Sequence, residues 1–228
     1  MITATDPRDL LLQEQVPTVM VPRFGEFRPL TKNGRRFLSA SDGLWLEVKT
    51  DWLHVVWPLA QQSRVAMPYG SLEKKVDFLY SSFPVDLIDR FYAEAREVFP
   101  SECAAWLIWN TQSRNFSYRP LRAINSGVGH LRYERPMLTE NECLICDIHS
   151  HGPIPALFSS EDDRDDRGEI KIAAVIGGLG EGNRLRVRFR LCVAGLNLPL
   201  NINLSKLSFF PDFVDEEAFV DEYTQMLG

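Results

Sequence analysis

Two histidines, a serine and an aspartate stand at fixed spacings in one short segment of this 228-residue chain. His149 and His151 are two of only four histidines, and a single residue separates them. Side chains alternate between the two faces of an extended segment, so both imidazoles point the same way. With a carboxylate downstream they form a set of three ligands that can hold a tetrahedral zinc ion and leave its fourth position open. An open position is typical of a catalytic zinc site, so the segment predicts a catalytic rather than a structural site.

The first 78 residues predict a small β-rich module whose role the sequence does not reveal. Residues 1–20 are polar and are expected to be irregular. Strands are expected at Leu44–Val48, after an Asp-Gly turn, and at Trp52–Trp57. Pro58 and a Met-Pro-Tyr-Gly turn are expected to close this region.

Residues 79–228 predict a mixed α/β domain, in which helices flank a sheet. Apolar residues recur every three or four positions after Pro84 and predict a helix that Pro100 ends. A charged helix capped by its first residue is expected over Ser159–Gly168, and an amphipathic helix over Asp212–Met226. Strands are expected at Glu102–Trp109, Phe116–Pro120, Glu142–His149, Ile170–Ile176, Leu185–Val193 and Leu198–Leu204.

The charge of the chain limits its partners. Its net charge is −6, so a nucleic acid is not an expected partner. Four arginines from Arg184 to Arg190 alternate with apolar residues, which predicts one solvated face of a strand rather than a basic patch. No apolar run approaches the roughly 20 residues that span a bilayer, and the N-terminus lacks a signal-peptide pattern. We therefore expect a soluble cytoplasmic protein with no membrane partner.

Other possible ligands and loops carry weaker signals. Cys143 and Cys146 have zinc-ribbon spacing, but there is no second pair and a strand would turn the two to opposite faces. His54, in a strand, and His130, in a loop, are expected to be structural or incidental. The glycine-rich segment 177–182 lacks the ending of a phosphate loop and is expected to join two strands as a hairpin. All four cysteines lie in apolar segments and are expected to be reduced and buried: Cys103, Cys143, Cys146 and Cys192.

An upstream glutamate, the His-x-His pair and a Ser-x-x-Asp pair follow one another along the chain. Seven residues separate His151 from Ser159, and two separate Ser159 from Asp162. This order resembles the JAMM signature of the JAB/MPN zinc metalloproteases, Glu … His-Ser-His-x₇-Ser-x-x-Asp. Glu102 follows a predicted helix and precedes small and then large apolar residues, as the upstream glutamate of the family does. The resemblance covers roughly residues 80–210 and implies the JAMM/MPN fold, a cytidine deaminase-like sheet flanked by helices.

The resemblance implies a role for each residue of the motif. It implies one Zn²⁺ per chain, bound by His149, His151 and Asp162. Glu102 would accept a proton from the attacking water and pass it to the leaving amine. Ser159 would donate its hydroxyl to the developing oxyanion, and it can cap its helix at the same time.

Neighbouring aspartates leave alternatives open. Asp163, Asp165 and Asp166 are rivals of Asp162 as the third ligand, and Asp163 forms a second Ser-x-x-Asp pair with Ser160. Only the pair Ser159 and Asp162 has the spacing of the family. Asp147 lies two residues before His149 on the same face, where it either orients a ligand or is simply polar at a strand end.

The resemblance also implies a class of substrate. Amide-cleaving members of the family commonly act on ubiquitin-like proteins, so we expect an isopeptidase or peptidase that cleaves at the C-terminus of such a modifier. Activating and conjugating enzyme homologues are expected companions. Residues 153–157 are expected to flank the cleft and to help hold an extended substrate tail by strand addition. A β-rich extension ahead of a JAMM domain also resembles the protein A type of the PRTRC plasmid-associated gene system.

Two other classes of function stay open. The chain can be a zinc hydrolase of small peptides or amino-acid conjugates. It can also be a non-catalytic MPN scaffold, although a scaffold is expected to lack one or more of the ligands, and here every ligand of the motif is present.

Overall fold

The computed structural model of the chain describes residues 6–61, 65–180, 185–204 and 207. Contacts divide the chain into two compact units, residues 1–81 and 82–228, each with its own sheet. No helix in this described part of the chain is long and apolar enough to cross a membrane. The helix expected at Asp212–Met226 lies outside the described residues.

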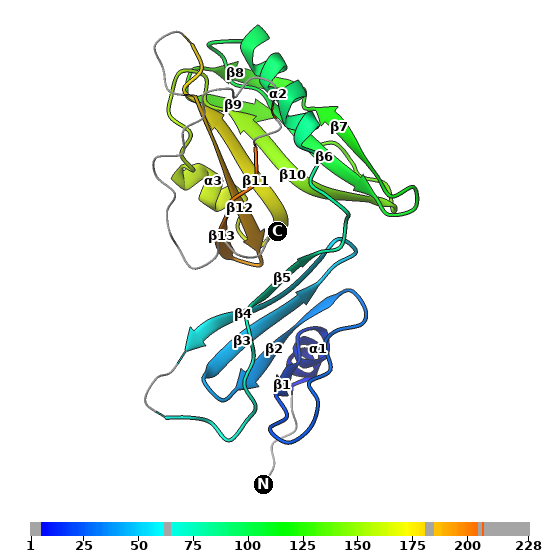
Figure 1. Ribbon diagram of the computed structural model, residues 1–228. Helices are drawn as coiled ribbons and strands as arrows, with labels where there is room; N and C mark the ends of the chain where they lie inside the picture. Colours follow the sequence, from blue (N-terminus) through cyan, green and yellow to red (C-terminus); the bar gives the residue numbers. More distant parts are fainter. Residues whose placement is uncertain (1–5, 62–64, 181–184, 205–206, 208–228) are drawn as a thin grey trace. The chain divides into compact units, whose positions relative to one another are not determined.

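The described residues of the N-terminal unit form one helix and five strands: α1 (Pro7–Gln15), β1 (Thr18–Met20), β2 (Gly34–Ala40), β3 (Gly43–Lys49), β4 (Leu53–Gln61) and β5 (Lys75–Phe78). The strands form one sheet in the order β1-β2-β3-β4-β5 (Figure 1). β1 and β2 are parallel, and the other neighbours are antiparallel. Leu38, Trp45 and Val56, from the three central strands, meet in the core of this unit.

The first residues of this unit differ from their prediction. Residues 6–20 include α1 and β1, so the expectation of irregular structure is wrong. The carboxylate of Asp6 accepts the N–H of Arg8, and Pro7 occupies the first turn. These residues are a helix start that polarity alone does not reveal. β4 also runs beyond its predicted end, because Pro58 lies beside a bulge, where a missing N–H is tolerated.

The described residues of the C-terminal unit form two helices and eight strands: α2 (Val85–Glu97), β6 (Ala104–Asn110), β7 (Asn115–Pro120), β8 (Ala123–Gly127), β9 (His130–Tyr133), β10 (Glu142–Ser150), α3 (Ser160–Asp165), β11 (Ile170–Gly177), β12 (Arg186–Val193) and β13 (Leu196–Leu200). Six strands form a sheet in the order β13-β12-β11-β10-β6-β7, and β8 pairs with β9 in a separate hairpin. Only β10 and β11 run parallel in this sheet. A parallel pair needs a crossover, and α3 lies in it.

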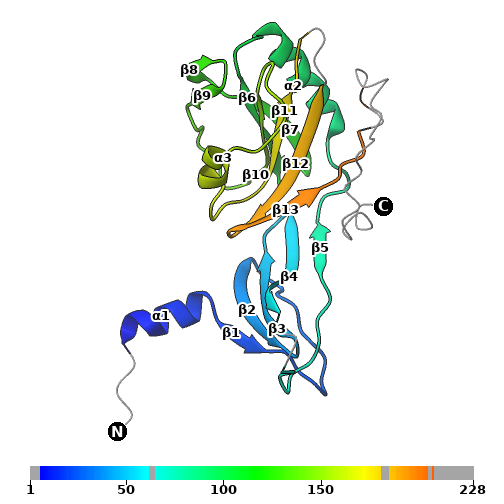
Figure 2. The ribbon, with the colours of Figure 1, turned by 90° about the vertical axis from the view of Figure 1, so that its left-hand side faces the viewer.

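The two helices lie on opposite faces of this sheet (Figure 2). The ring of Phe189 in β12 meets Phe83, just before α2, whereas the neighbouring Arg190 bonds to residues of α3 and its C-cap. Successive residues on a strand point to opposite faces, so the α2 side and α3 lie on opposite faces of the sheet. α2 turns an apolar stripe inward, made of Ile88, Phe91 and Ala95.

The mixed α+β class with a β-rich N-terminal part is confirmed. The helix after Pro84 and the helix capped by Ser159 are also confirmed. The bounds of the last predicted strand are wrong, because β13 begins at Leu196. Ala194 and Gly195 both have positive φ and close a tight hairpin that pairs β13 with β12. β8 and β9 are strands that the sequence did not predict.

Candidate metal centre

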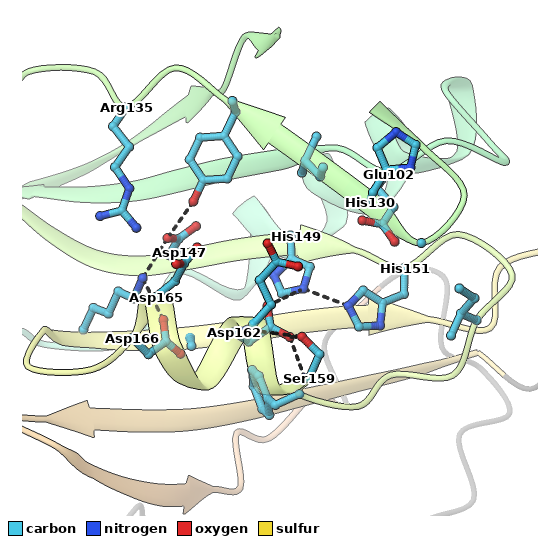
Figure 3. Close-up of a pocket in the computed structure, with 18 residues that line it drawn as sticks. Glu102, His130, Arg135, Asp147, His149, His151, Ser159, Asp162, Asp165 and Asp166 are labelled. Carbon is cyan, nitrogen blue, oxygen red and sulfur yellow. Dashed lines mark hydrogen bonds and ion pairs between the residues drawn. The ribbon is translucent and has the colours of Figure 1, made fainter. Parts of the chain in front are cut away.

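The two histidines lie at the carboxyl end of β10, near the middle of the sheet. His149 is the last residue but one of this strand, and His151 directly follows its end. The N–H of His151 still donates to the carbonyl of Ile176 in β11 at 2.8 Å, so the chain stays extended. Both imidazoles therefore project on the face where α3 lies (Figure 3). Their Nε2 atoms are 3.0 Å apart.

Asp162 reaches the histidines from the first turn of α3. Ser159 is the N-cap of this helix, and its hydroxyl accepts the N–H of Asp162 at 3.2 Å. The N–H of Ser159 donates in return to Oδ2 of Asp162 at 2.6 Å, which completes a capping box. The other oxygen, Oδ1, lies 3.4 Å from Nε2 of His149. One ligand atom from each of His149, His151 and Asp162 thus lies within 4.8 Å of the others.

This set of donors fits a zinc ion. Ligands bonded at about 2.0–2.1 Å to tetrahedral zinc are separated by about 3.3 Å. The 3.0 Å between the two Nε2 atoms and the 3.4 Å from His149 to Asp162 are close to this separation. Nδ1–H of His151 donates to the carbonyl of Pro155 at 3.2 Å, and in this tautomer of the neutral ring Nε2 is available to a metal. Burial lowers the pKa of His149 and so favours the neutral imidazole that binds metal.

Glu102 lies just before β6, and the β8–β9 hairpin holds it beside the histidines (Figure 3). Its N–H donates to the carbonyl of Gly127 at 3.2 Å, and the hydroxyl of Ser126 donates to its carbonyl. Burial raises the pKa of the Glu102 carboxyl, and the nearby His151 and the N–H of Gly129 offset this only in part. A carboxyl with a raised pKa that faces a cavity can take up and release a proton.

Ser159 lines the same cavity beside the ligands. Its hydroxyl donates to Oδ2 of Asp162 at 2.7 Å and accepts the N–H of the same residue. Both bonds belong to the start of α3, so the hydroxyl acts as a helix cap in this structure. A rotation about χ1 would free its proton for another acceptor in the cavity.

The structure brings all five predicted site residues to one cavity of about 270 Å³. Ile154, from the segment expected to flank the cleft, and Asp147 also line this cavity, but several other lining residues were not predicted. His130 was expected in a loop but is the first residue of β9. Leu131, Tyr133 and Arg135 line the cavity, and their spacing of two residues is the signal in the sequence that could have predicted a strand with one face toward the site. Asp165 and Asp166, which were rivals of Asp162, also line the cavity, and the charged or polar lining residues that were missed are His130, Tyr133, Arg135, Glu161 and Lys171.

A buried group of charges lies beside the ligands on the same face of the sheet. Nζ of Lys171 is 2.9 Å from a carboxylate oxygen of each of Asp147, Asp166 and Glu169. The hydroxyl of Tyr133 also donates to Asp147, at 3.2 Å. Asp147 lies inside β10 rather than at its end, so the interpretation as a polar strand end is wrong. Its carboxylate is an ion-pair partner of Lys171.

The arginine row of β12 also needs a correction. Arg188 is exposed, as a solvated face requires, but the side chain of Arg190 is only 8% exposed. Its guanidinium donates to Asp163 and to Asp166. The alternation of charged and apolar residues is the same for a solvated face and for a face that an acidic helix covers, so the pattern could not separate them.

The remaining candidates from the sequence serve the fold. His54 lies in β4 of the N-terminal unit, 2.9 Å from a carboxylate oxygen of Glu47. All four cysteines are free, and the described residues contain no group that could hold a metal ion apart from the two histidines and Asp162. β11 and β12 are antiparallel and pair as far as Gly177 and Arg186, so the expected hairpin is confirmed, with residues 181–184 outside the described part.

The fold and the site together define a class of α+β domain with a candidate His₂-Asp metal-ligand set at the crossover between two parallel strands. Residues 84–192 match the family described as prokaryotic homologs of the JAB domain. The C-terminal unit therefore contains a domain similar to the prokaryotic homologs of the JAB domain, which confirms the resemblance seen in the motif. Residues 6–79 match a domain of unknown function, DUF2016. No curated protein and no solved structure matches the chain.

Proposed function

We propose that the C-terminal unit is a zinc-dependent hydrolase of amide bonds. One observation carries the proposal: His149, His151 and Asp162 converge within 4.8 Å of one another, and Glu102 lines the same cavity. Three protein ligands leave one position of a tetrahedral ion open, as in catalytic zinc sites. When bound, a zinc ion supplies a Lewis acid that lowers the pKa of a water toward about 7 and polarises a carbonyl.

Glu102 is the proposed general base and acid. Its pKa is raised by burial, and its carboxyl group lines the cavity beside His151 and His130. It would take a proton from the attacking water and deliver it to the nitrogen of the leaving amine. No covalent intermediate with the protein is needed, because water is the nucleophile.

Ser159 is the proposed donor to the oxyanion. Its hydroxyl already lies at the ligand set, 2.7 Å from Oδ2 of Asp162. Rotation toward a substrate would direct the proton at the carbonyl oxygen on which charge develops. One donor of this kind contributes roughly 3 kcal/mol to the stability of a transition state.

The proposed substrate is the C-terminal tail of a ubiquitin-like protein, cleaved from a conjugate or from a precursor. Ile154 lines the cavity and Leu157 is exposed beside it, so the loop after His151 offers apolar contacts to an extended chain. The companions of such a modifier would be homologues of activating and conjugating enzymes. Four free cysteines suit a reducing compartment such as the cytoplasm.

The first experiment is elemental analysis of the purified protein, without chelator, beside Asp162→Ala. We expect about one zinc ion per chain in the wild type and a large loss in the variant, because one of three protein ligands is gone. Asp165→Ala is the matched control, since it removes a carboxylate from the same helix. Zinc-free wild-type protein would contradict the hydrolase and favour a non-catalytic scaffold.

A second measurement separates the substrate classes. The zinc-loaded protein is given a ubiquitin-like protein with a C-terminal amide extension, and separately short peptide amides. Cleavage of the extension alone supports the proposed substrate. Cleavage of the short amides with equal kcat/KM favours the alternative, a hydrolase of small peptides or amino-acid conjugates.

A further inference from the structure

Helix α3 carries the ligand Asp162 but has no apolar anchor. None of the residues of this helix, Ser160–Asp165, is buried. A surface helix normally gains its stability from an apolar stripe packed on the core, and an isolated helix of this length is unstable in water. A metal ligand must nevertheless be held in place. Contacts other than apolar burial therefore fix α3 to the sheet.

Arg190 of β12 supplies several of these contacts at once. Its guanidinium donates to Asp166, the C-cap of α3, from Nε at 3.1 Å and from Nη2 at 2.7 Å. Nη1 donates to Asp163, which directly follows the ligand Asp162. The guanidinium also lies over the ring of Phe158, 4.0 Å from its centre, just before the helix begins. One side chain thus binds the segment before α3, its first turn and its end.

Lys171 of β11 holds the same end of the helix. Its Nζ is 2.9 Å from Oδ1 of Asp166. Burial alone would raise the pKa of Asp166, but Lys171 and Arg190 outweigh it and leave this pKa below its usual value. The carboxylate therefore stays charged, and its ion pairs persist. Desolvation offsets much of the attraction within a buried ion pair, but removal of one partner leaves a buried charge uncompensated.

We propose that Arg190 is a positioning residue, which holds α3 on the sheet and thereby sets the place of Asp162 and the zinc affinity of the site. The inference rests on the zinc site proposed above. Loss of a group that supports a metal ligand typically weakens metal binding by about 10–100-fold. Because Arg190 acts through the helix, we expect an effect of roughly tenfold or more.

The sign of this effect separates positioning from simple charge. Arg190 is a cation close to the ligand set, so a purely Coulombic account predicts that its removal strengthens the binding of a divalent cation. Loss of the position of Asp162 predicts the opposite. The direction of the change in zinc affinity therefore decides between the Coulombic account and the positioning account.

The test measures zinc affinity by competition with a chromogenic chelator. Arg190→Met is compared with the wild type and with Arg188→Met, which removes an exposed arginine from the same face of β12. We expect Arg190→Met to bind zinc roughly tenfold more weakly or worse, and Arg188→Met to bind it as the wild type does. Equal or tighter binding by Arg190→Met overturns the inference.

A milder pair of variants guards against loss of the fold. The side chain of Asp163 is 53% exposed, so Asp163→Asn removes a partner of Arg190 without opening the core. Asp165→Asn removes the same charge from an exposed position that lines the cavity. We expect Asp163→Asn to weaken zinc binding more than Asp165→Asn does, and to add nothing when Arg190 is already methionine. Equal effects of the two asparagines contradict positioning.

Hydrogen exchange of the metal-free protein supplies a readout that does not depend on zinc. The N–H groups of Asp163 and Asp166 donate to the carbonyls of Ser159 and Asp162, so their exchange reports opening of α3. We expect roughly tenfold faster exchange there in Arg190→Met, with β10 and β11 unchanged. If the wild type binds no zinc, the proposed function fails, and this measurement still decides whether Arg190 holds the helix. Unchanged exchange rejects the inference.

Discussion

Among the described residues, each unit contains one buried glutamate, and the two differ in the hydrogen-bond donors around the carboxylate. Glu47 of the N-terminal unit is fully buried and accepts the N–H of Leu30 at 2.7 Å and Nε–H of Arg36 at 2.6 Å. Its other close contact is Nε2 of His54, at 2.9 Å. Glu102 of the C-terminal unit is 6% exposed and lines the cavity, with its carboxylate bonded to the N–H of Gly129. The two glutamates are buried to a similar degree, but the Glu47 carboxylate has more hydrogen-bond donors around it than the Glu102 carboxylate has.

This difference separates a carboxylate that serves the fold from the proposed catalytic one. Arg36, Glu47 and His54 lie on β2, β3 and β4, so the full set of donors around Glu47 ties three strands together. Glu102 has an open side, and its pKa is raised by burial. The number of donors, more than the depth of burial, therefore predicts which glutamate does chemistry.

The largest expected effect comes from Glu102→Gln. We expect kcat/KM for the amide substrate to fall by about 10²–10⁴-fold, because the general base is lost while the shape of the side chain is kept. The zinc content should stay at the level of the wild type. The melting temperature should stay the same or rise, because a neutral amide is easier to bury than a carboxylate. Wild-type activity in this variant would contradict the proposed role of Glu102 as general base, and the two glutamates would then not differ in reactivity.

The second test concerns the hydroxyl of Ser159, the proposed donor to the oxyanion. Glycine is nearly as good an N-cap as serine, so Ser159→Gly should lower the free energy of unfolding by only a few tenths of a kcal/mol. The proposed donor to the oxyanion is lost, and we expect kcat to fall by about 10²–10³-fold. Ser159→Thr is the control, because it keeps the hydroxyl. Equal rates for the glycine variant and the wild type would leave Ser159 with its capping role alone.

The candidate ligands could be located from the sequence because they lie close together along the chain. His149, His151 and Asp162 occupy the end of one strand and the crossover that follows it, so local spacing determines how they meet. Glu102 required the family resemblance, because it comes from another strand. Arg190 and Lys171 could not be located, since only tertiary pairing of β11 and β12 with α3 brings them to the site.

The same distinction applies to the fold. β6 is an almost continuous apolar run, β10 and β11 are mostly apolar, and α2 has a clear helical period, so each was predicted. β8 is mostly exposed, and α1 buries no side chain, so neither carries an apolar pattern. Their formation depends on caps and hairpin contacts that periodicity does not record.

A smaller effect is expected from Glu47→Gln in the N-terminal unit. Removal of one member of a buried ion pair costs about 3–5 kcal/mol, and we expect the lower end because Arg36 keeps partial access to water. Denaturant unfolding of the full chain measures the loss. Asp77→Asn is the matched control, since its ion pair with Lys75 is about half exposed and should contribute less than about 1 kcal/mol. The zinc content should not change. A loss of activity per folded molecule would show that Glu47 is more than a structural tie.

The smallest effect tests whether the donors themselves make Glu47 structural. His54→Phe removes one donor and keeps a ring at a buried position, so the carboxylate loses a charge-assisted bond worth about 1.5–3 kcal/mol. His54→Gln keeps an N–H that can reach the same oxygen and should destabilise the unit less. Denaturant unfolding of the two variants gives the difference directly. If both lose the same free energy, packing of the ring rather than the hydrogen bond is what matters, and the number of donors no longer explains why Glu47 and Glu102 differ.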